Sequence, residues 1–210
     1  MREIAVGLGF ASAGGTAGAV GRWLLARLRR GATVHSGWCE IAVAILWGVI
    51  GFRLASGRLP GWWAPIPLML GWLAVVLTVT DLRHRRLPDA LTLPAYLVAG
   101  VLLAAASAWG GRGQLLAGAA AGMTVFLAVH AGVRRLRPNG MGAGDVKLSG
   151  SLGAVLGAVG WPALVLAAWL AAVCTLGLRV VARKRYRDGV PHGPGLLAAT
   201  LLISLFPGRL

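Results

Sequence analysis

The chain alternates between long apolar stretches and short segments rich in polar residues, glycine and proline. Several apolar stretches approach the length of about 20 residues that a helix needs to cross a bilayer. Turn signals such as Pro60-Gly61, Gly110-Gly111 and Pro138-Asn139-Gly140 separate them. This pattern predicts an all-α membrane bundle of about eight transmembrane helices, forming one domain over residues 1–210. The expected helices cover residues 4–26, 40–55, 62–80, 89–109, 114–133, 145–160, 161–182 and 195–206. The second, sixth and eighth are short, so we expect one of them to be re-entrant or extended by its flanks.

Composition supports a membrane location. Of the 210 residues, 57% are hydrophobic and 13% are charged, and the mean hydropathy is +0.74. A soluble domain carries about a quarter charged residues. Glycine pairs at four-residue spacing, such as Gly118 and Gly122 or Gly153 and Gly157, predict close approach of helix backbones in lipid. We therefore expect a multi-pass protein of the cytoplasmic membrane, with the lipid bilayer as a partner.

The basic residues indicate the orientation. Sixteen of the 21 fall in alternate loops, as expected for loops on the cytoplasmic side, and five fall in the others. The larger group comprises Arg22, Arg27, Arg29, Arg30, Arg83, Arg85, Arg86, Arg134, Arg135, Arg137, Lys147, Arg179, Arg183, Lys184, Arg185 and Arg187. The smaller group comprises Arg2, Arg53, Arg58, Arg112 and Arg209. This split predicts that both termini lie outside. Despite the net charge of +15, no basic face or base-stacking module is visible, so we expect no nucleic-acid partner.

Carboxylates are scarce enough to consider singly. They are Glu3, Glu40, Asp81, Asp89, Asp145 and Asp188. A carboxylate near the end of a span is costly unless it is paired or functional. Taken alone, Asp81 is explained as an interfacial anchor paired with Arg85. Asp145 and Asp89 are explained as helix caps.

Asp81 and Asp145 together favour a catalytic role. Two complete expected spans separate them, so both return to the same membrane face. Gly142 and Gly144 permit tight backbone approach beside Asp145. Two carboxyl groups within about 3 Å share a proton, so one can act as a base on water and the other as an acid toward a peptide carbonyl. Such chemistry needs neither a metal nor a cofactor.

Two motifs resemble those of a known family. Residues 140–148, GMGAGDVKL, resemble the G-x-G-D-x-K-L signature of type IV prepilin peptidases. Asp81 with residues 87–94, LPDALTLP, is similar to the first aspartate motif of that family. Glu40, in WCEI at residues 38–41, faintly resembles a family glutamate that follows a tyrosine-proline pair. The resemblance covers residues 40–195.

The resemblance implies a membrane aspartyl endopeptidase with Asp81 and Asp145 as its catalytic carboxylates. The supporting residues would be Gly142, Gly144, Lys147, Pro88, Asp89 and Glu40. The substrate would be a prepilin or pseudopilin, whose short basic leader is cut at the cytoplasmic side of its hydrophobic helix.

This chain departs from the family pattern in two places. Many members carry a cytoplasmic insert with paired cysteines and also methylate the new amino terminus, whereas the stretch at residues 27–37 is short and has no cysteine pair. The resemblance is therefore to a peptidase-only form, with methyl transfer doubtful and no cofactor expected. His192, in PHGP at residues 191–194, stands where an aromatic residue is more usual.

The role of Lys147 and the class of the protein each leave an alternative open. Lys147 is two positions after Asp145, so it points to another side of the helix and is expected to reach lipid phosphates, with substrate orientation as the alternative. A small ion- or proton-coupled transporter could use the same carboxylates. The nearly non-polar span centres and the lack of an internal repeat argue against it. A structural subunit of a secretion machine is a third possibility.

Overall fold

The computed structural model describes residues 1–28, 32–84, 87–137, 141–182 and 190–208. These residues form eight helices and no strand, so the all-α prediction is confirmed. The helices are α1 (Arg2–Arg27), α2 (Trp38–Ala55), α3 (Pro65–His84), α4 (Asp89–Trp109), α5 (Gln114–Leu136), α6 (Ala143–Val159), α7 (Trp161–Val181) and α8 (Gly193–Ser204). Most boundaries lie within a few residues of those expected. The largest extension is at α3, whose last turn runs past Asp81 to His84.

Six of the helices, α1 to α5 and α7, are long and apolar enough to cross a membrane. The chain is therefore a polytopic membrane bundle. The two remaining helices are shorter, with 17 residues in α6 and 12 in α8. At 1.5 Å per residue, α8 extends only about 18 Å, whereas the hydrocarbon core of a bilayer is about 30 Å thick. The helices α6 and α7 meet at Gly160, whose φ of 150° is accessible to glycine.

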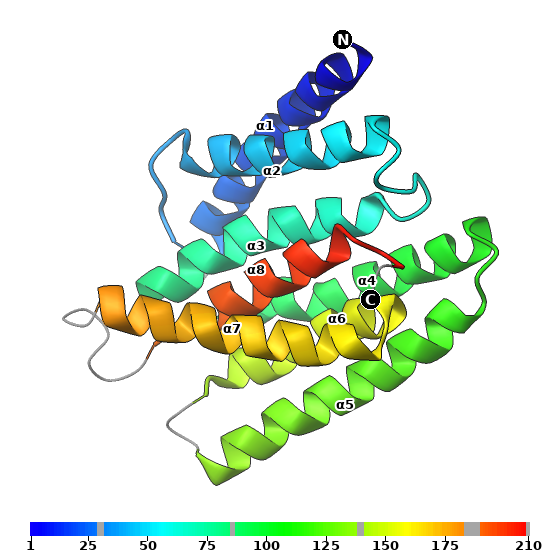
Figure 1. The fold of residues 1–210 in the computed structure, drawn as a ribbon. Coiled ribbons are helices and arrows are strands. Elements are labelled where there is room, and N and C mark those ends of the chain that lie inside the picture. Colours follow the sequence, from blue (N-terminus) through cyan, green and yellow to red (C-terminus); the bar gives the residue numbers. More distant parts are fainter. Residues whose placement is uncertain (29–31, 85–86, 138–140, 183–189, 209–210) are drawn as a thin grey trace.

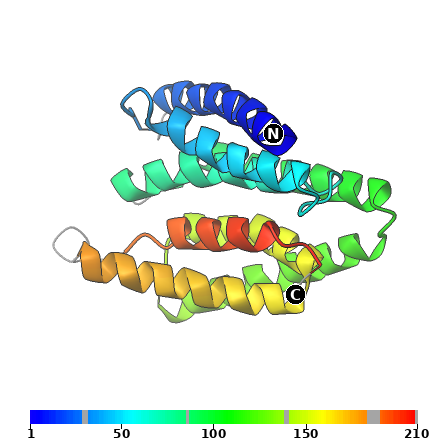
Figure 2. The same ribbon diagram turned by 45° about the horizontal axis from the view of Figure 1, so that its top comes forward.

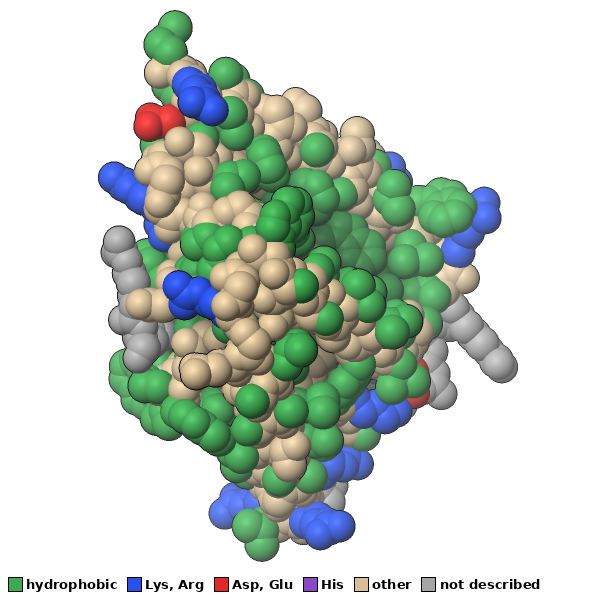
Figure 3. All heavy atoms as spheres, turned by 90° about the vertical axis from the view of Figure 1, so that its right-hand side faces the viewer, with side chains coloured by type: hydrophobic (Ala, Val, Ile, Leu, Met, Phe, Trp, Pro, Cys, Tyr) green, Lys and Arg blue, Asp and Glu red, His purple; other side chains and the backbone are tan. Residues whose placement is uncertain are grey.

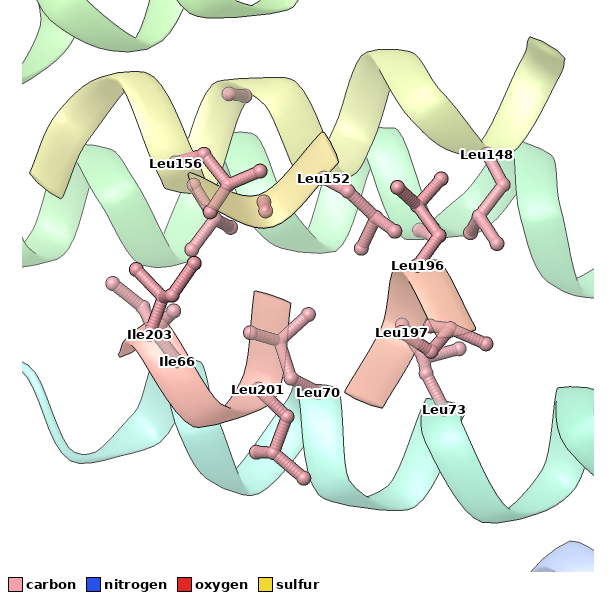
Figure 4. Packing of buried hydrophobic residues seen from close by; sticks show 14 of the residues in the cluster. Ile66, Leu70, Leu73, Leu148, Leu152, Leu156, Leu196, Leu197, Leu201 and Ile203 are labelled. Atoms are coloured by element: carbon pink, nitrogen blue, oxygen red, sulfur yellow. The ribbon is translucent and has the colours of Figure 1, made fainter. Parts of the chain in front are cut away.

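The bundle has two sides with α8 between them. Helices α1 and α2 pack together, with α3 beside α2, and the other side holds α5, α6 and α7 (Figures 1 and 2). Figure 4 shows α8 enclosed by leucines of α6 and aliphatic side chains of α3. Leu196 and Leu197 of α8 are fully buried against these neighbours, and most of the helix is buried. The shortest helix is thus the most central one.

Glycines bring two helix pairs almost into backbone contact. A methyl group added at Gly18 of α1 would lie 2.5 Å from the carbonyl oxygen of Cys39 in α2. One added at Gly118 of α5 would lie 2.5 Å from the carbonyl oxygen of Gly157 in α6. Real Cβ atoms do not approach this closely, so only glycine fits there. The prediction that these small residues mediate close helix packing is confirmed.

Successive loops gather at opposite ends of the bundle. At one end, Arg83 of α3 donates a hydrogen bond to the carbonyl of Thr33 in the α1–α2 loop. At the other end, the indole of Trp63 donates to the carbonyl of Ser204, at 2.8 Å. This alternation is the one that the basic clusters predict. Some residues of those clusters lie outside the described part of the chain: Arg29, Arg30, Arg85, Arg86, Arg183, Lys184, Arg185, Arg187 and Arg209. Which end faces the cytoplasm stays a prediction.

Large hydrophobic side chains cover the outer surface. Leu97 on α4 is 71% exposed and Trp169 on α7 is 62% exposed. Figure 3 shows hydrophobic side chains over much of one end and its flanks, with basic side chains toward the margins. In a bilayer, the exposed apolar sides of helices such as α4 and α7 would contact lipid tails.

Candidate active site

Asp81 is buried near the end of α3. Only 4% of its surface is exposed, although it lies one turn from the end of the helix. The preceding residue, Thr80, turns its hydroxyl back to the carbonyl of Leu77 at 2.8 Å and is also buried. The alternative explanation of Asp81 as an interfacial anchor is therefore not supported, because its side chain is buried in the bundle. Its expected partner Arg85 lies outside the described residues.

Asp145 is buried in the first turn of α6, with 7% of its surface exposed. Asp145 is not the N-cap residue itself, because Gly142 occupies that position and Asp145 follows three residues later. Its carboxyl group reaches back to the backbone of Gly142, and Oδ2 lies 3.1 Å from where a Cβ of Gly142 would be. A side chain at the N-cap would therefore crowd the Asp145 carboxyl group, and a supporting role for Gly142 stays a prediction.

Gly144 provides a second close approach. A Cβ added there would lie 2.8 Å from Cβ of Leu87, the residue before Pro88. Pro88 in turn is the N-cap residue of α4, with φ near −68°. The two motifs found in the sequence therefore pack against each other through Gly144 and Leu87. Leu87 is buried, with only 8% of its surface exposed.

The carboxyl groups converge on Gly193, the first residue of α8. A Cβ added there would lie 2.8 Å from Oδ2 of Asp81 and 3.1 Å from Oδ1 of Asp145. The backbone of Gly193 also interacts with both carboxyl groups. Asp81 and Asp145 are thus neighbours across three helices, α3, α6 and α8. Sequence reasoning missed Gly193, although the Pro-His-Gly-Pro turn before the last apolar stretch was a signal for it.

Two oxygens of this cluster are buried without a hydrogen bond of ordinary geometry. Within the described part of the chain, they are Oδ2 of Asp81 and Oδ1 of Asp145. Burying a carboxylate oxygen without a full partner is costly in a membrane bundle. The positive ends of the α6 and α8 dipoles offset part of this cost, since both helices begin at the cluster. Two like charges so close favour a state in which the pair holds one proton.

The other expected residues lie around this cluster in different roles. Lys147 was expected to reach lipid phosphates, but its Nζ instead forms an ion pair with Oδ1 of Asp89 at 2.8 Å. Asp89 was expected to cap α4, but the N-cap residue of this helix is Pro88, whose side chain has no hydrogen-bond donor or acceptor. Among the described residues, no side chain makes a capping hydrogen bond to α4. The Lys147–Asp89 pair joins α6 to α4 at the end of the bundle that holds the carboxyl cluster.

Glu40 lies in a separate contact at the start of α2. Its Oε1 accepts a hydrogen bond from Nε of Arg22 in α1 at 2.7 Å. Its Oε2 accepts the backbone N–H of Gly37 at 3.0 Å, so the carboxylate also caps its own helix. Both described partners belong to the α1–α2 side. Glu40 therefore fastens these two helices and does not join the Asp81–Asp145 cluster.

Comparison with known proteins identifies the family. The sequence profile of the type IV leader peptidase family matches residues 68–177. The chain belongs to the type IV leader peptidase family. The matched segment of this leader peptidase family member contains both Asp81 and Asp145 and ends before Gly193.

Curated relatives agree with this assignment. A prepilin leader peptidase/N-methyltransferase of Aeromonas hydrophila is 34% identical over 159 residues, covering 75% of this chain and 54% of the relative. The leader peptidase HopD of Escherichia coli is 32% identical over 151 residues, covering 69% of this chain and 97% of HopD. The chain thus spans about half the length of the Aeromonas relatives and nearly all of HopD. No solved structure gives a significant match.

Proposed function

We propose that this protein is a membrane aspartyl endopeptidase that removes the leader from prepilins or pilin-like proteins at the cytoplasmic membrane face. The observation that carries the proposal is the convergence of Asp81 and Asp145 on Gly193. Family membership supports the peptidase class. It favours this function over a transporter that would use the same carboxylates for ion binding.

The proposed chemistry needs only the two carboxyl groups and a water molecule. With one proton shared between them, the ionised carboxyl takes a proton from water as the water attacks the peptide carbonyl. The protonated carboxyl then donates to the carbonyl oxygen, and the resulting tetrahedral intermediate collapses with proton transfer to the leaving amine. Burial and the two helix N-termini supply a fixed electrostatic environment for these transfers.

Cleavage of a prepilin tests the proposal directly. The protein in detergent, incubated with a full-length prepilin, is expected to release a shortened pilin detectable by mass spectrometry. The transporter alternative is tested with the protein in proteoliposomes, where a pH-sensitive dye inside the vesicles reports proton flux. Protein-dependent proton or ion flux without cleavage would reject the peptidase and favour transport, and neither activity would favour a structural subunit.

Membrane topology gives a further prediction. The alternating basic clusters predict that the ends of α3 and α5 face the cytoplasm and that the end of α2 faces outward. In a variant with Cys39 and Cys174 replaced by alanine, a single cysteine at Arg58 should react with a membrane-impermeant maleimide in spheroplasts. A single cysteine at Arg137 should react only after permeabilisation. The reverse pattern would place the carboxyl cluster on the outer face and reject cytoplasmic-side cleavage.

We also expect cleavage without methylation. The stretch at residues 27–37 is too short to fold a cofactor-binding module, and it has no cysteine pair for a stabilising metal. When this protein is the only peptidase present, the mature pilin should carry a free α-amine by mass spectrometry. An additional methyl group that appears only when the protein is present would contradict this expectation.

A further inference from the structure

We propose that His192, held by Thr175, is a positioning residue that fixes the backbone of Gly193 against the carboxyl groups of Asp81 and Asp145. The catalytic consequence of this inference rests on the proposed peptidase function. The positioning itself is a structural claim about five helices, α3, α5, α6, α7 and α8, that meet at one turn.

The hydrogen bond between His192 and Thr175 has a defined direction. The Thr175 hydroxyl donates its single proton to the carbonyl of Ala171 at 2.7 Å. Its oxygen also lies 2.8 Å from Nδ1 of His192. Because the hydroxyl proton is already used, the ring must donate from Nδ1–H to the Thr175 oxygen. This fixes both the tautomer and the orientation of the His192 ring against α7.

A ring from α5 also lies near His192. The His130 ring lies 6.1 Å from the His192 ring, centroid to centroid, with the two planes tilted by 38°. His130 is itself held, because its Nδ1 lies 2.7 Å from the carbonyl of Phe126, which can only accept. Burial, and then the neighbouring His130, lower the pKa of His192, which favours the neutral ring. His192 is therefore held by Thr175 of α7 and lies near His130 of α5.

The position of His192 transmits this constraint to the carboxyl cluster. His192 is the N-cap residue of α8, and the next residue is Gly193. The first turn of α8 is also pressed against α7, since a Cβ at Gly195 would lie 2.8 Å from the carbonyl oxygen of Ala171 and 3.3 Å from Oγ1 of Thr175. Loss of the His192–Thr175 bond would free the residue before Gly193 while leaving both aspartates in place. A phenylalanine ring at this position could fill the space but could not donate a hydrogen bond.

The test compares variants that separate this bond from general packing. Thr175→Val and His192→Phe remove it. Thr175→Ser keeps the acceptor oxygen, and His192→Asn keeps a donor at the position of Nδ1. Thr200→Val is the matched control. The buried Thr200 hydroxyl also donates to the carbonyl four residues earlier, that of Leu196 at 2.8 Å, and within the described part of the chain it has no hydrogen bond with a histidine. Size-exclusion chromatography and thermal unfolding in detergent would confirm that each variant folds.

Prepilin cleavage supplies the first readout. Thr175→Val and His192→Phe should each lower kcat by about tenfold, the effect of losing one well-placed hydrogen bond, with KM changed less than about twofold. Thr175→Ser, His192→Asn and Thr200→Val should stay near wild-type kcat. A purely structural role would instead reduce the amount of folded protein and leave kcat per folded molecule unchanged, and that result would overturn the inference.

Infrared spectroscopy supplies a readout that does not depend on cleavage. Difference spectra between low and high pH reveal the carbonyl stretching band of protonated carboxyl groups. If this band is lost in Asp81→Asn and Asp145→Asn, it belongs to the Asp81–Asp145 cluster. Thr175→Val should shift this band, and Thr200→Val should not. An unshifted band in Thr175→Val would reject the positioning role. If the wild-type protein failed to cleave prepilin, the proposed function would fall, while the infrared comparison would still decide this inference.

Discussion

Asp81→Asn and Asp145→Asn are each expected to reduce prepilin cleavage by about a thousandfold or more, while the protein still accumulates in the membrane. An amide can neither take a proton from water nor share one with its neighbour, so general acid–base catalysis by the pair is lost. Both side chains are buried at the same glycine, and asparagine has nearly the same size as aspartate. The fold should therefore persist. Cleavage by purified variants, followed by mass spectrometry, measures the effect.

Asp89→Asn is the matched control for these substitutions. Asp89 lies at the same end of the bundle, but its carboxylate is half exposed and pairs with Lys147. Exposed ion pairs contribute at most about 1 kcal/mol, so this variant should keep most of its activity. Treatment with a chelator should also leave cleavage unchanged. Near-normal turnover by either Asp81→Asn or Asp145→Asn would exclude the aspartyl mechanism, and strong inhibition by chelators would point to a metal enzyme.

Gly193→Ala should lower kcat by about a hundredfold with little effect on global stability. The added methyl group would lie 2.8 Å from Oδ2 of Asp81 and 3.1 Å from Oδ1 of Asp145, so at least one carboxyl group must move. Displacing a catalytic group by about 1 Å costs about a hundredfold in rate. Steady-state kinetics on the variant, with its thermal unfolding measured in parallel, would show whether the loss is catalytic.

Gly177→Ala controls for the general effect of adding a methyl group to a glycine. Gly177 belongs to α7, and nothing lies within 4 Å of the position of its missing Cβ. This variant should behave like the wild type, or be slightly more stable because alanine favours helix. Wild-type kcat in Gly193→Ala would mean that the carboxyl groups do not meet at Gly193 during catalysis.

The fold was largely predictable because lipid imposes a simple pattern on sequence. Long apolar stretches must form helices in a bilayer, and this requirement located all eight of those in the described residues. Glycine spacing likewise predicted close helix approach at Gly118 and Gly157, and the structure shows that Gly118 of α5 meets Gly157 of α6. The separation of Asp81 and Asp145 by two stretches placed them at the same end of the bundle. Each of these inferences depends on a feature that is local in the sequence.

The parts that escaped prediction depend on contacts between distant helices. In a membrane protein, apolar side chains face both lipid and protein, so composition could not show that α8 is buried and central. Lys147 and Asp89 are 58 positions apart in the sequence, and no local pattern around either residue indicates that they form an ion pair. Gly193 was missed for the same reason, since the Pro-His-Gly-Pro turn signals a helix start but does not show that Asp81 and Asp145 lie against it.

The central position of α8 has a consequence for biosynthesis. Ribosomes make the helices in order, so α3 and α6, which carry the two aspartates, leave the ribosome before α8 exists. Until α8 inserts between them, the carboxyl groups lack the Gly193 backbone. The aliphatic side chains of α3 and α6 likewise lack the α8 leucines that pack between them (Figure 4). The nascent protein thus holds both acidic groups without their final surroundings. Docking of the last helix completes these surroundings, so the Asp81–Asp145 cluster is assembled only late in the maturation of the chain.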